Sequence, residues 1–494
     1  MKYFFILLIV FMLNIFSAPI LSLDNHYWSN QFGSRSALMS GAVVGGVRDT
    51  SAGFYNPGAL GFVKQSSFSV SANGYQFEQV ILDDGVGTGD DLDSQNISVI
   101  PLLVSGTFDL YGHTFGYSIM TKQDSSVNMS ARHEGRFDIL ASNPITLGTG
   151  TAFDGLEEYR GQYLYNSQVS EYWGGLSWAK RHHHISYGIS GFVALRKENH
   201  DVTALARATN LQIAQGLQVG TQDLIRHVDF YNMRSLLKFG IAVDFEPLKL
   251  GATLTTPSVN LFGNGSSARS FSTTKSDESL LNPHPTIPYN TVIDDRQEDL
   301  DAEYKTPLSI ALGLEYAFTP KTRLAGTVEW FAKQNRYAVM TPASREMFVG
   351  KPPPFADIIF VDSQQALKVE NAAKDVVNFA VAVEQSFNET YKGYFSFRTD
   401  FSSFNLNPDE TIAIANDLDI YHITLGMTHK GKESELALGL TYSFGKQDQL
   451  ERPINLNPLS TNRDSASFLF PNSGETSARY SAFGIIVGYT YFFK

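Results

Sequence analysis

The sequence of 494 residues contains no cysteine. Disulfides, cysteine-ligated metals and lipid attachment through an N-terminal cysteine are therefore excluded. Positive charge is also scarce, because 38 lysine and arginine residues stand against 50 aspartate and glutamate residues, giving a net charge of −12. An acidic balance of this kind argues against a nucleic-acid partner. Beyond the N-terminus, no apolar run approaches the roughly 18 residues that a membrane-spanning helix needs.

The N-terminal segment, residues 1–22, reads MKYFFILLIVFMLNIFSAPILS. Lys2 supplies a positive charge, residues 3–16 are almost wholly apolar, and small residues follow. This is the pattern of a secretory signal peptide, and we expect the mature chain to start between Pro19 and Asn25. A transmembrane helix is the alternative, but the run is short and lacks a stop-transfer flank. The sequence therefore predicts an exported protein.

Aromatic residues and glycine are abundant, with 36 Phe, 23 Tyr and 40 Gly. An exported chain that is rich in both and has no apolar helix is typical of an outer-membrane β-barrel. Soluble periplasmic proteins carry the same export signal, so composition alone does not decide between the two classes.

The period with which apolar and polar residues alternate along the sequence distinguishes between these two classes. Residues 433–446, ESELALGLTYSFGK, alternate large apolar side chains with small or polar ones, and residues 308–318 and 483–493 do the same. A period of two sustained for this long predicts strands longer than the five or six residues of ordinary globular strands. Eleven such residues, tilted by about 40°, cover roughly 28 Å, which matches the hydrocarbon core of a membrane.

Fourteen segments show this alternation, at about 66–77, 97–109, 112–123, 168–180, 183–197, 230–246, 248–258, 306–318, 321–338, 375–388, 391–404, 418–430, 433–447 and 480–494. Short turns and long polar gaps alternate strictly between them. The long gaps are 78–96, 124–167, 198–229, 259–305, 339–374, 405–417 and 448–479. Short periplasmic turns, long outer loops and an even strand count predict an all-β fold, a 14-stranded antiparallel transmembrane β-barrel over residues 66–494.

Residues 23–65 precede the first expected strand and are rich in small side chains, as in GSRSALMSGAVVGG (33–46). A ring of this strand number has a backbone diameter of roughly 28 Å and would leave a water-filled hole. We therefore expect these residues to form an N-terminal hatch in the lumen, where irregular backbone faces protein rather than lipid. The turn at Asn56-Pro57-Gly58 would lead the chain from the hatch into the first strand.

Strand parity predicts which charged residues face the lumen. They are Lys238, Asp244, Glu315, Arg323, Glu329, Lys333, Glu384, Arg398, Asp400 and Glu435. Both signs are interspersed, which suits a lumen paired with a polar plug, and Arg48 and Asp49 of the hatch are candidate partners. The other interpretation is that these charges only solvate a wet lumen, because polar interiors are usual in such barrels.

The hatch sequence GSRSALMSGAVVGGVRDTSAGFYNPGAL (33–60) resembles the FadL/TodX family of outer-membrane transporters for hydrophobic compounds. That family has small-residue helices followed by an acidic residue, a Ser, an aromatic residue and Asn-Pro-Ala-Gly-Leu. The matching residues here are Asp49, Ser51, Phe54, Asn56, Pro57 and Leu60. Gly58-Ala59 reverses the usual order, and residues 250–263 and 307–316 also look similar to the family's strands.

The resemblance implies passive uptake of a long-chain fatty acid or a related lipid or hydrocarbon. Ligand would be captured by the outer loops, pass to a site beside the hatch, and leave sideways through an inward kink of the third strand. Gly116 permits such a kink in residues 112–123. Phe115 lies on the apolar face of this strand and Met120 on the other, so Met120 either lines an apolar passage or is a stray lumen methionine.

The resemblance also implies a monomer in the bacterial outer membrane, in contact with lipid and lipopolysaccharide and inserted by barrel-assembly machinery. The aromatic C-terminus GYTYFFK suits that insertion. No cofactor is expected, and no Ser/His grouping suggests an enzyme. The alternative function is a secretion-machinery component, or a protein-binding or adhesive surface protein, because some related barrels serve such roles.

Two further patterns in the sequence, one of histidines and one of acidic residues, are candidate metal sites. His182, His183 and His184 follow one another at a short turn, where neighbouring side chains in a strand point to opposite faces, so a solvated turn is favoured over a metal site. Residues 83–93, DDGVGTGDDLD, are acidic but lack the spacing of an EF-hand. An outer loop is the favoured interpretation there, with calcium binding left open.

Overall fold

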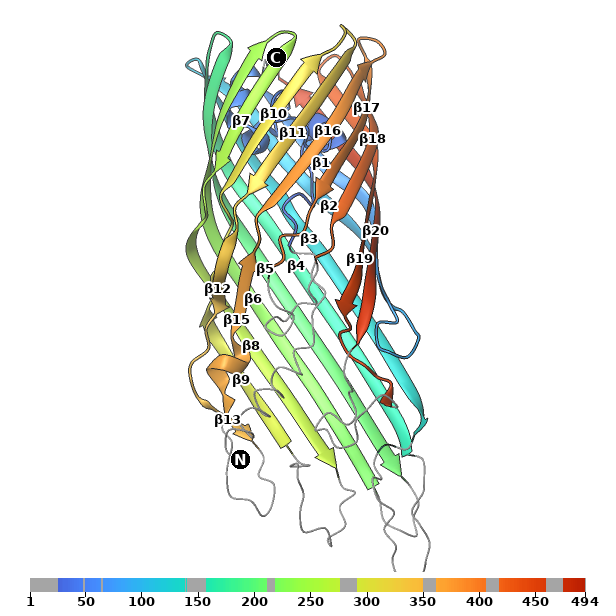
Figure 1. Cartoon of the computed structure of the whole chain (residues 1–494). Helices are drawn as coiled ribbons and strands as arrows, with labels where there is room; N and C mark the ends of the chain where they lie inside the picture. Colours follow the sequence, from blue (N-terminus) through green and yellow to red (C-terminus); the bar gives the residue numbers. More distant parts are fainter. Residues whose placement is uncertain are drawn as a thin grey trace, which may run out of the picture.

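The computed structural model describes residues 25–47, 49–63, 65–137, 139, 157–210, 218–275, 291–349, 361–405, 417–458 and 474–493. Fourteen of the described strands form a closed antiparallel barrel (Figure 1), as the sequence predicts. In chain order they are β1 (Ser67–Asp83), β2 (Leu92–Leu110), β3 (His113–Phe137), β4 (Glu157–His182), β5 (Ile185–Asn210), β6 (Gln218–Phe245), β7 (Leu248–Thr255), β10 (Ser309–Ala317), β11 (Thr322–Phe331), β16 (Val376–Ser386), β17 (Tyr391–Asp400), β18 (Ile420–Lys430), β19 (Ser434–Glu451) and β20 (Glu475–Phe492).

Each of these strands pairs with the next, and β20 pairs with β1 to close the ring. The alternation of the sequence accounts for the two faces of the wall. In β19, Leu438 is 48% exposed on the outer face, whereas Ala437 is fully buried on the inner face. Since a closed ring satisfies its own backbone groups and this one presents an apolar belt outward, it is built to span a membrane.

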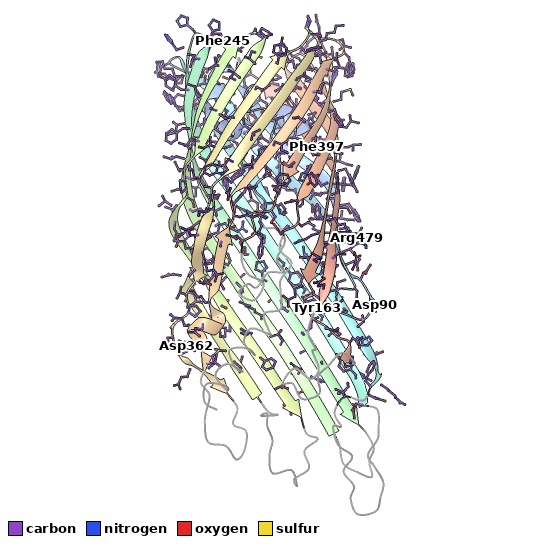
Figure 2. The ribbon with its side chains drawn as sticks, viewed as in Figure 1. Asp90, Tyr163, Phe245, Asp362, Phe397 and Arg479 are labelled. Atoms are coloured by element: carbon purple, nitrogen blue, oxygen red, sulfur yellow. The ribbon has the colours of Figure 1, made fainter. Side chains whose placement is uncertain are left out.

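Four neighbouring strands, β3 to β6, are much longer than the sequence predicts, at 25 to 28 residues. At about 3.3 Å per residue and a tilt of about 40°, they rise roughly 65 Å, more than twice the thickness of a hydrocarbon core. Figure 2 shows Tyr163 of β4 and Phe245 of β6 at widely separated heights of the wall. One side of the barrel therefore continues well beyond the membrane.

The prediction that residues 124–167, 198–229 and 259–305 are loops is therefore wrong for a large part of each range. The outer faces of these extensions carry polar residues, so they lack the apolar-outward signal that marks a lipid-facing strand. The ladder continues there as β8 (Val259–Lys275) on β6 and β9 (Thr291–Asp301) on β8.

The predicted strand 321–338 is also corrected, because β11 ends at Phe331. The chain continues as β12 (Gln334–Met340), which pairs with β15 (Val369–Ala373) outside the barrel ladder. Lys333 lies at this break and is exposed, rather than facing the lumen as predicted. The short elements β13 (Glu346–Val349), β14 (Val361–Asp362) and α4 (Ser363–Leu367) complete this side of the long end.

The interior holds two apolar clusters at different heights. One surrounds the N-terminal segment near the short-turn end and includes Phe32, Leu60, Met120, Trp173 and Phe192. The other lines the inner face of the extended wall. The N-terminal segment, in blue in Figure 1, lies inside the barrel at the end where the short turns and the C-terminus are found.

Candidate functional site

The hatch contains three short helices, α2 (Ser34–Leu38), α3 (Ala52–Tyr55) and η1 (Pro57–Phe62). Within the described ranges, no helix combines the length and the apolar character needed to cross a membrane. Helices this short depend on tertiary contacts for their stability, since isolated helices of this length do not persist in water. The barrel wall supplies these contacts.

Asn56 begins the last hatch helix and fastens it to the wall. Its side-chain oxygen accepts a hydrogen bond from the Gly58 amide at 3.0 Å, which caps η1. Its side-chain nitrogen donates to the carbonyl oxygens of Val44 at 2.9 Å and Ile241 at 3.0 Å. One amide side chain thus joins two parts of the hatch to strand β6.

Leu60, also on η1, is fully buried, and it packs towards Gly116 of β3. A methyl group on Gly116 would lie 3.5 Å from the Leu60 side chain. Gly116 is paired with Thr107 on one side and Ser177 on the other. The glycine expected to permit a kink therefore lies in intact ladders and faces the hatch.

Arg35 of α2 makes the main ionic contact between hatch and wall. It donates to Glu384 of β16 at 2.6 Å and to Glu315 of β10 at 2.9 Å, and all three side chains are almost completely buried. Arg323 and Lys392 lie against the same two carboxylates, at 3.1 Å and 3.2 Å. The structure thus contains ion pairs between charged residues of the lumen and the hatch, and Arg35 is the hatch cation that forms them.

Of the two hatch charges that the sequence offers as partners of the lumen, Asp49 lies within the described residues and makes its contacts inside the hatch. Asp49 accepts hydrogen bonds from the backbone amides of Ser36 and Ser51 and from the Ser51 hydroxyl, so it ties α2 to α3 within the hatch. The hydroxyl oxygens of Ser51 and Ser36 lie 3.1 Å apart, within hydrogen-bonding distance. Arg48 lies outside the described residues.

Trp28, near the start of the hatch, also forms hydrogen bonds with the barrel wall. Its indole nitrogen donates to Glu329 at 2.8 Å, and its backbone nitrogen donates to Asp400 at 3.0 Å. Arg398 donates to the Ser29 carbonyl oxygen at 2.9 Å. Glu329, Asp400 and Arg398, all expected in the lumen, therefore hold the start of the hatch.

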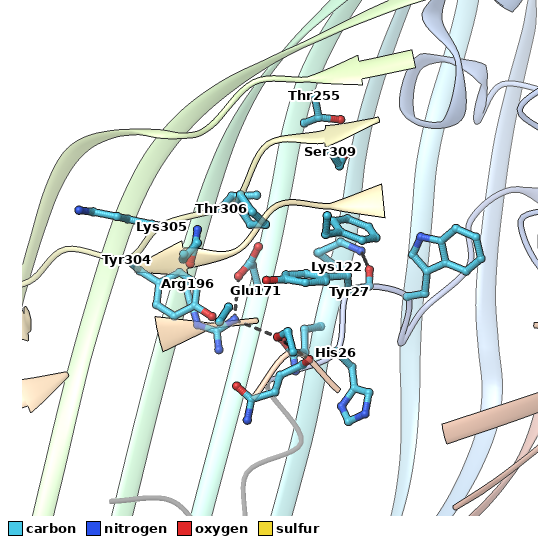
Figure 3. A pocket seen from close by; sticks show the side chains of 18 of the residues that line it. His26, Tyr27, Lys122, Glu171, Arg196, Thr255, Tyr304, Lys305, Thr306 and Ser309 are labelled. Atoms are coloured by element: carbon cyan, nitrogen blue, oxygen red, sulfur yellow. Dashed lines mark hydrogen bonds and ion pairs between the residues drawn. The ribbon is translucent and has the colours of Figure 1, made fainter. Parts of the chain in front are cut away.

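A partly open cavity lies between the hatch and the inner wall (Figure 3). Its lining combines aromatic rings with an excess of cations over carboxylates. The rings are Tyr27, Trp28, Phe54, Trp173, Tyr304 and Phe331, the cations are Lys122, Arg196, Arg234, Lys238 and Lys305, and the carboxylates are Glu171 and Glu329. Such a site suits a ligand with an apolar body and a negative charge.

Phe54, the aromatic residue of the hatch motif, forms part of the cavity lining. Its ring packs against Trp173 and Phe192, with ring centroids 6.1 Å and 6.4 Å apart. The ammonium groups of Lys238 and Lys122 lie 4.7 Å and 5.6 Å from its centroid, in the range of cation–π interactions. Phe54 therefore presents one aromatic ring to two lysines.

The two lysines differ in their hydrogen bonds. Lys122 donates to the carbonyl oxygen of Tyr27. Lys238 is only 5% exposed, and no residue in the described part of the chain accepts a hydrogen bond from its ammonium group. The Lys238 side chain is largely buried and borders the cavity, so an anion bound there would supply an acceptor for its ammonium group.

Elsewhere in the cavity lining, two arginines share one carboxylate. Glu171 accepts from Arg196 at 2.9 Å and from Arg234 at 2.6 Å. The same guanidinium groups lie 4.1 Å and 5.0 Å from the ring centroid of Tyr304, and Figure 3 shows Arg196 beside Tyr304 and Glu171. Glu198 pairs with Arg196 as well, so this cluster is electrically balanced and differs from the lysine pair.

A seam in the wall lies close to this cavity. The β2–β3 ladder ends at Leu103 and Met120, and beyond it β2 pairs only with β1 and β3 only with β4. Lys122 forms a bulge in β3 at this level, and the inward parity of β3 changes from even to odd residues across it. We call the unpaired stretch between residues 92–102 and 121–137 the β2–β3 seam.

Two features disfavour backbone hydrogen bonds between the strands across the β2–β3 seam. Pro101 of β2 has no amide hydrogen to donate, and its carbonyl oxygen is taken by the Thr121 hydroxyl at 2.6 Å. Further along, the Asn128 amide donates to the Ser94 hydroxyl at 2.9 Å instead of to backbone. Ile97 and Val99 are exposed on the outer face beside the seam, so it borders the lipid belt.

The candidate metal patterns gain no support as sites from their surroundings. His182 to His184 are exposed at the β4–β5 turn. Asp84 and Asp83 of the acidic segment pair with Arg452 and Arg479. Among the described residues, no group of three or more His, Asp or Glu side chains is arranged to hold a metal ion.

These features define a transmembrane β-barrel with an N-terminal plug, a cavity beside the plug and a seam in its wall. Among solved structures, it is similar to the toluene transporter TodX of Pseudomonas putida, with a TM-score of 0.51 and 14% identity over 94% of this chain and 99% of that one. It is also similar to a Pseudomonas aeruginosa FadL homologue, with a TM-score of 0.52 and 11% identity over 95% and 100% of the two chains. At this identity the likeness concerns the fold, and at that level the predicted resemblance is confirmed. In sequence, the chain matches no protein-family model and no curated protein.

Proposed function

We propose that the protein mediates passive uptake of amphiphilic organic acids, such as long-chain fatty acids, across the bacterial outer membrane. The observation that carries this proposal is Lys238, whose largely buried side chain lines the cavity and whose ammonium group has no hydrogen-bond acceptor in the described chain. A carboxylate bound there would form a charge-assisted hydrogen bond and offset the charge of both lysines beside Phe54.

The rest of the cavity suits the apolar tail of such a ligand. Phe54, Trp173 and Phe192 form one aromatic group, and they belong to the same apolar cluster as Leu103 and Met120, where the β2–β3 ladder ends. An apolar surface thus continues from the cavity to the seam. A ligand that follows it must displace Met120 and would then reach the lipid sideways.

This route has a physical rationale. The β2–β3 seam begins eight residues from the β2–β3 turn, roughly 20 Å above the short-turn rim for a strand tilted by about 40°. That height lies within the membrane if the short turns face the periplasm and the extended wall faces outward. An apolar solute released there enters the bilayer directly and avoids the polar periplasmic side.

The geometry favours a small molecule over the alternative of a protein partner in a secretion or adhesive role. The cavity lies between hatch and wall in the interior of the barrel, whereas a protein partner would need a large exposed apolar face. We further propose that the chain works as a monomer surrounded by outer-membrane lipid and lipopolysaccharide.

The test is uptake of radiolabelled dodecanoate and dodecane by cells whose own fatty-acid channel has been deleted. Wild-type protein should raise dodecanoate uptake above the empty-vector level. Lys238→Gln should lower that uptake about ten-fold, because it removes one charge-assisted hydrogen bond, and should leave dodecane uptake unchanged.

Lys180→Gln is the matched control, because Lys180 is exposed beside the β4–β5 turn, away from the cavity. The amount of folded barrel is compared by heat-modifiable mobility on gels. Uptake at the empty-vector level by the wild-type protein would refute transport of this class. Equal dodecanoate uptake by wild type and Lys238→Gln would refute the assignment of the head group to Lys238.

A further inference from the structure

The outer face of the extended wall changes from apolar to polar beyond the membrane. On β4, Tyr172 of the apolar belt is 45% exposed, and the outward residues that follow it are Ser170, Gln168 and Asn166. At about 3.3 Å per residue and a tilt of about 40°, Asn166 lies roughly 15 Å above Tyr172, and Arg160 lies roughly 30 Å above it. With the long end facing outward, this surface borders the sugars of lipopolysaccharide rather than its acyl chains.

A shallow hollow lies on this outer face, across strands β3, β4 and β5. Six outward side chains line it, in two adjacent rows of the ladder: Asn128, Asn166 and Asp201 in one, and Ser130, Leu164 and Thr203 in the other. Within the described residues, no hydrogen bond engages the side chains of Ser130, Asn166 or Thr203. Amide and hydroxyl groups beside one aliphatic side chain suit a sugar, which presents hydroxyl groups at its rim and C–H groups on its faces.

Two arginines extend this surface towards the end of the wall. Arg160 of β4 and Arg207 of β5 are exposed and directly paired across the ladder. In the part of the chain that the structure describes, no ion pair or hydrogen bond engages either guanidinium group. Glu134, opposite Arg160 on β3, pairs with Arg132 at 2.9 Å instead. Like charges directly opposite each other repel, and an anionic group between them would replace this repulsion with two attractive contacts.

We propose that the outer face of β3, β4 and β5 binds the core oligosaccharide of lipopolysaccharide. Its sugars lie in the hollow, and one of its phosphate groups lies between Arg160 and Arg207. A planar guanidinium group forms parallel hydrogen bonds with phosphate oxygens, so an arginine pair suits this anion. The proposal rests on the proposed function only for the orientation of the barrel, with the long end outward, and it does not depend on which solute crosses.

The distance between the two parts of this surface fits an oligosaccharide. Leu164 and Arg160 lie four residues apart on the same face of β4, roughly 13 Å along the strand. A single sugar cannot cover this span, whereas a short chain of sugars can. The bound chain would also brace β3, which beyond the start of the β2–β3 seam pairs only with β4.

The test measures binding of deacylated lipopolysaccharide to the full-length protein in nanodiscs by isothermal titration calorimetry. Deacylation removes the chains that would enter the lipid and leaves the phosphorylated core. The double variant Arg160→Gln/Arg207→Gln should raise the dissociation constant about ten- to hundred-fold, because it removes the charge-assisted hydrogen bonds to phosphate. Asn166→Leu in the hollow should raise it severalfold, because it removes hydrogen bonds to a sugar.

Lys180→Gln/Lys321→Gln is the matched control, since it removes two exposed positive charges at short turns on the opposite end of the barrel and should bind like wild type. Arg160→Lys/Arg207→Lys should keep part of the affinity, because it keeps the charges and loses the planar fork. Removing the phosphate groups from the oligosaccharide should abolish the difference between wild type and the double glutamine variant. Heat-modifiable mobility on gels shows that each variant is folded.

Three results would overturn the proposal. They are the absence of binding by wild type, equal affinity of wild type and the double glutamine variant, and full displacement by millimolar inorganic phosphate, which would indicate a site for small anions alone. Dodecanoate uptake by the double glutamine variant should equal that of wild type, because both arginines lie outside the lumen. Failure of wild-type uptake would count against the proposed function and not against this surface, so the two failures are distinguishable.

Discussion

Gly58 of the hatch and Gly240 of β6 lie in direct backbone contact. A methyl group on Gly58 would be 2.7 Å from the Gly240 carbonyl oxygen, and one on Gly240 would be 2.7 Å from the Gly58 nitrogen. Neither backbone can withdraw, since Asn56 fixes the hatch to the adjacent Ile241 carbonyl oxygen. This contact explains why Gly rather than Ala stands first after Asn-Pro in this chain.

The first prediction follows from this contact. Gly240→Ala should destabilise the docked hatch by about 1–3 kcal/mol, because the added methyl group overlaps backbone that has no room to move. The open fraction, and with it the mean conductance of the barrel in planar bilayers, should rise by about ten- to hundred-fold. Gly174→Ala is the control, since nothing lies within 4 Å of a methyl group there. Equal conductance of both variants would mean that the contact does not hold the hatch.

The second prediction concerns Arg35. Arg35→Met leaves Glu315 and Glu384 buried beside the hatch without their common cation, and breaking a buried pair of this kind costs about 3–5 kcal/mol. The hatch of this variant should be released at a lower urea concentration than in wild type, as measured by protease cleavage within residues 25–47. Adding Glu315→Gln and Glu384→Gln should recover part of the loss. A triple variant no better than Arg35→Met would show that charge is not the cause.

The third prediction concerns the β2–β3 seam. Because the chain has no cysteine, Ser94→Cys/Val127→Cys introduces the only thiols, at two inward-facing residues beside the 2.9 Å hydrogen bond from the Asn128 amide to the Ser94 hydroxyl. Oxidation should hold the seam closed and reduce uptake of dodecanoate severalfold, with recovery on reduction. Asp109→Cys/Thr114→Cys links residues that already pair beside the turn and should have no effect. Uptake that is insensitive to the seam cross-link would place the exit elsewhere.

The fourth prediction concerns pH and Asp295, on the long end outside the membrane. Burial works against its ionisation, but hydrogen bonds from Arg345 and Ser363 outweigh it and lower the pKa to about 2. An ordinary aspartate has a pKa of about 3.9, so this carboxylate stabilises the contact fully above about pH 4 and loses that effect as the pH falls through about 2.

Pepsin, which is active across this range, provides the measurement. The chain around β13 should resist cleavage at pH 4 and become sensitive near pH 2, whereas Asp295→Asn should be sensitive at both. Asp294→Asn, at the exposed neighbouring position, should behave as wild type. Resistance of Asp295→Asn at pH 4 would contradict the role of the carboxylate.

Strand parity made part of the site predictable from the sequence. Glu315, Glu384 and Asp400 lie in long alternating segments, where the face of each side chain follows from counting. Arg35 could not be found in this way, because it lies in irregular backbone, where counting says nothing of direction.

The seam shows a second limit of the sequence. Both flanking strands change parity at the same level, β2 between Leu102 and Leu103 and β3 around Lys122. A single inserted residue reverses which side chains face inward, and it leaves no mark in hydrophobicity. Lys122 therefore could not be assigned to the cavity from its sequence, although Pro101 hints at an interrupted ladder nearby.

The Ser34 hydroxyl lies 3.0 Å from the Thr490 hydroxyl on the last strand and 3.3 Å from that of Ser69 on the first. The hatch thus touches both strands whose meeting closes the ring. The contact with Thr490 cannot form until β20 is in place, so the contacts of Ser34 are complete only when the ring closes. Closure of the ring and completion of the plug are therefore coupled late events, and an unfinished barrel is also an unsealed one.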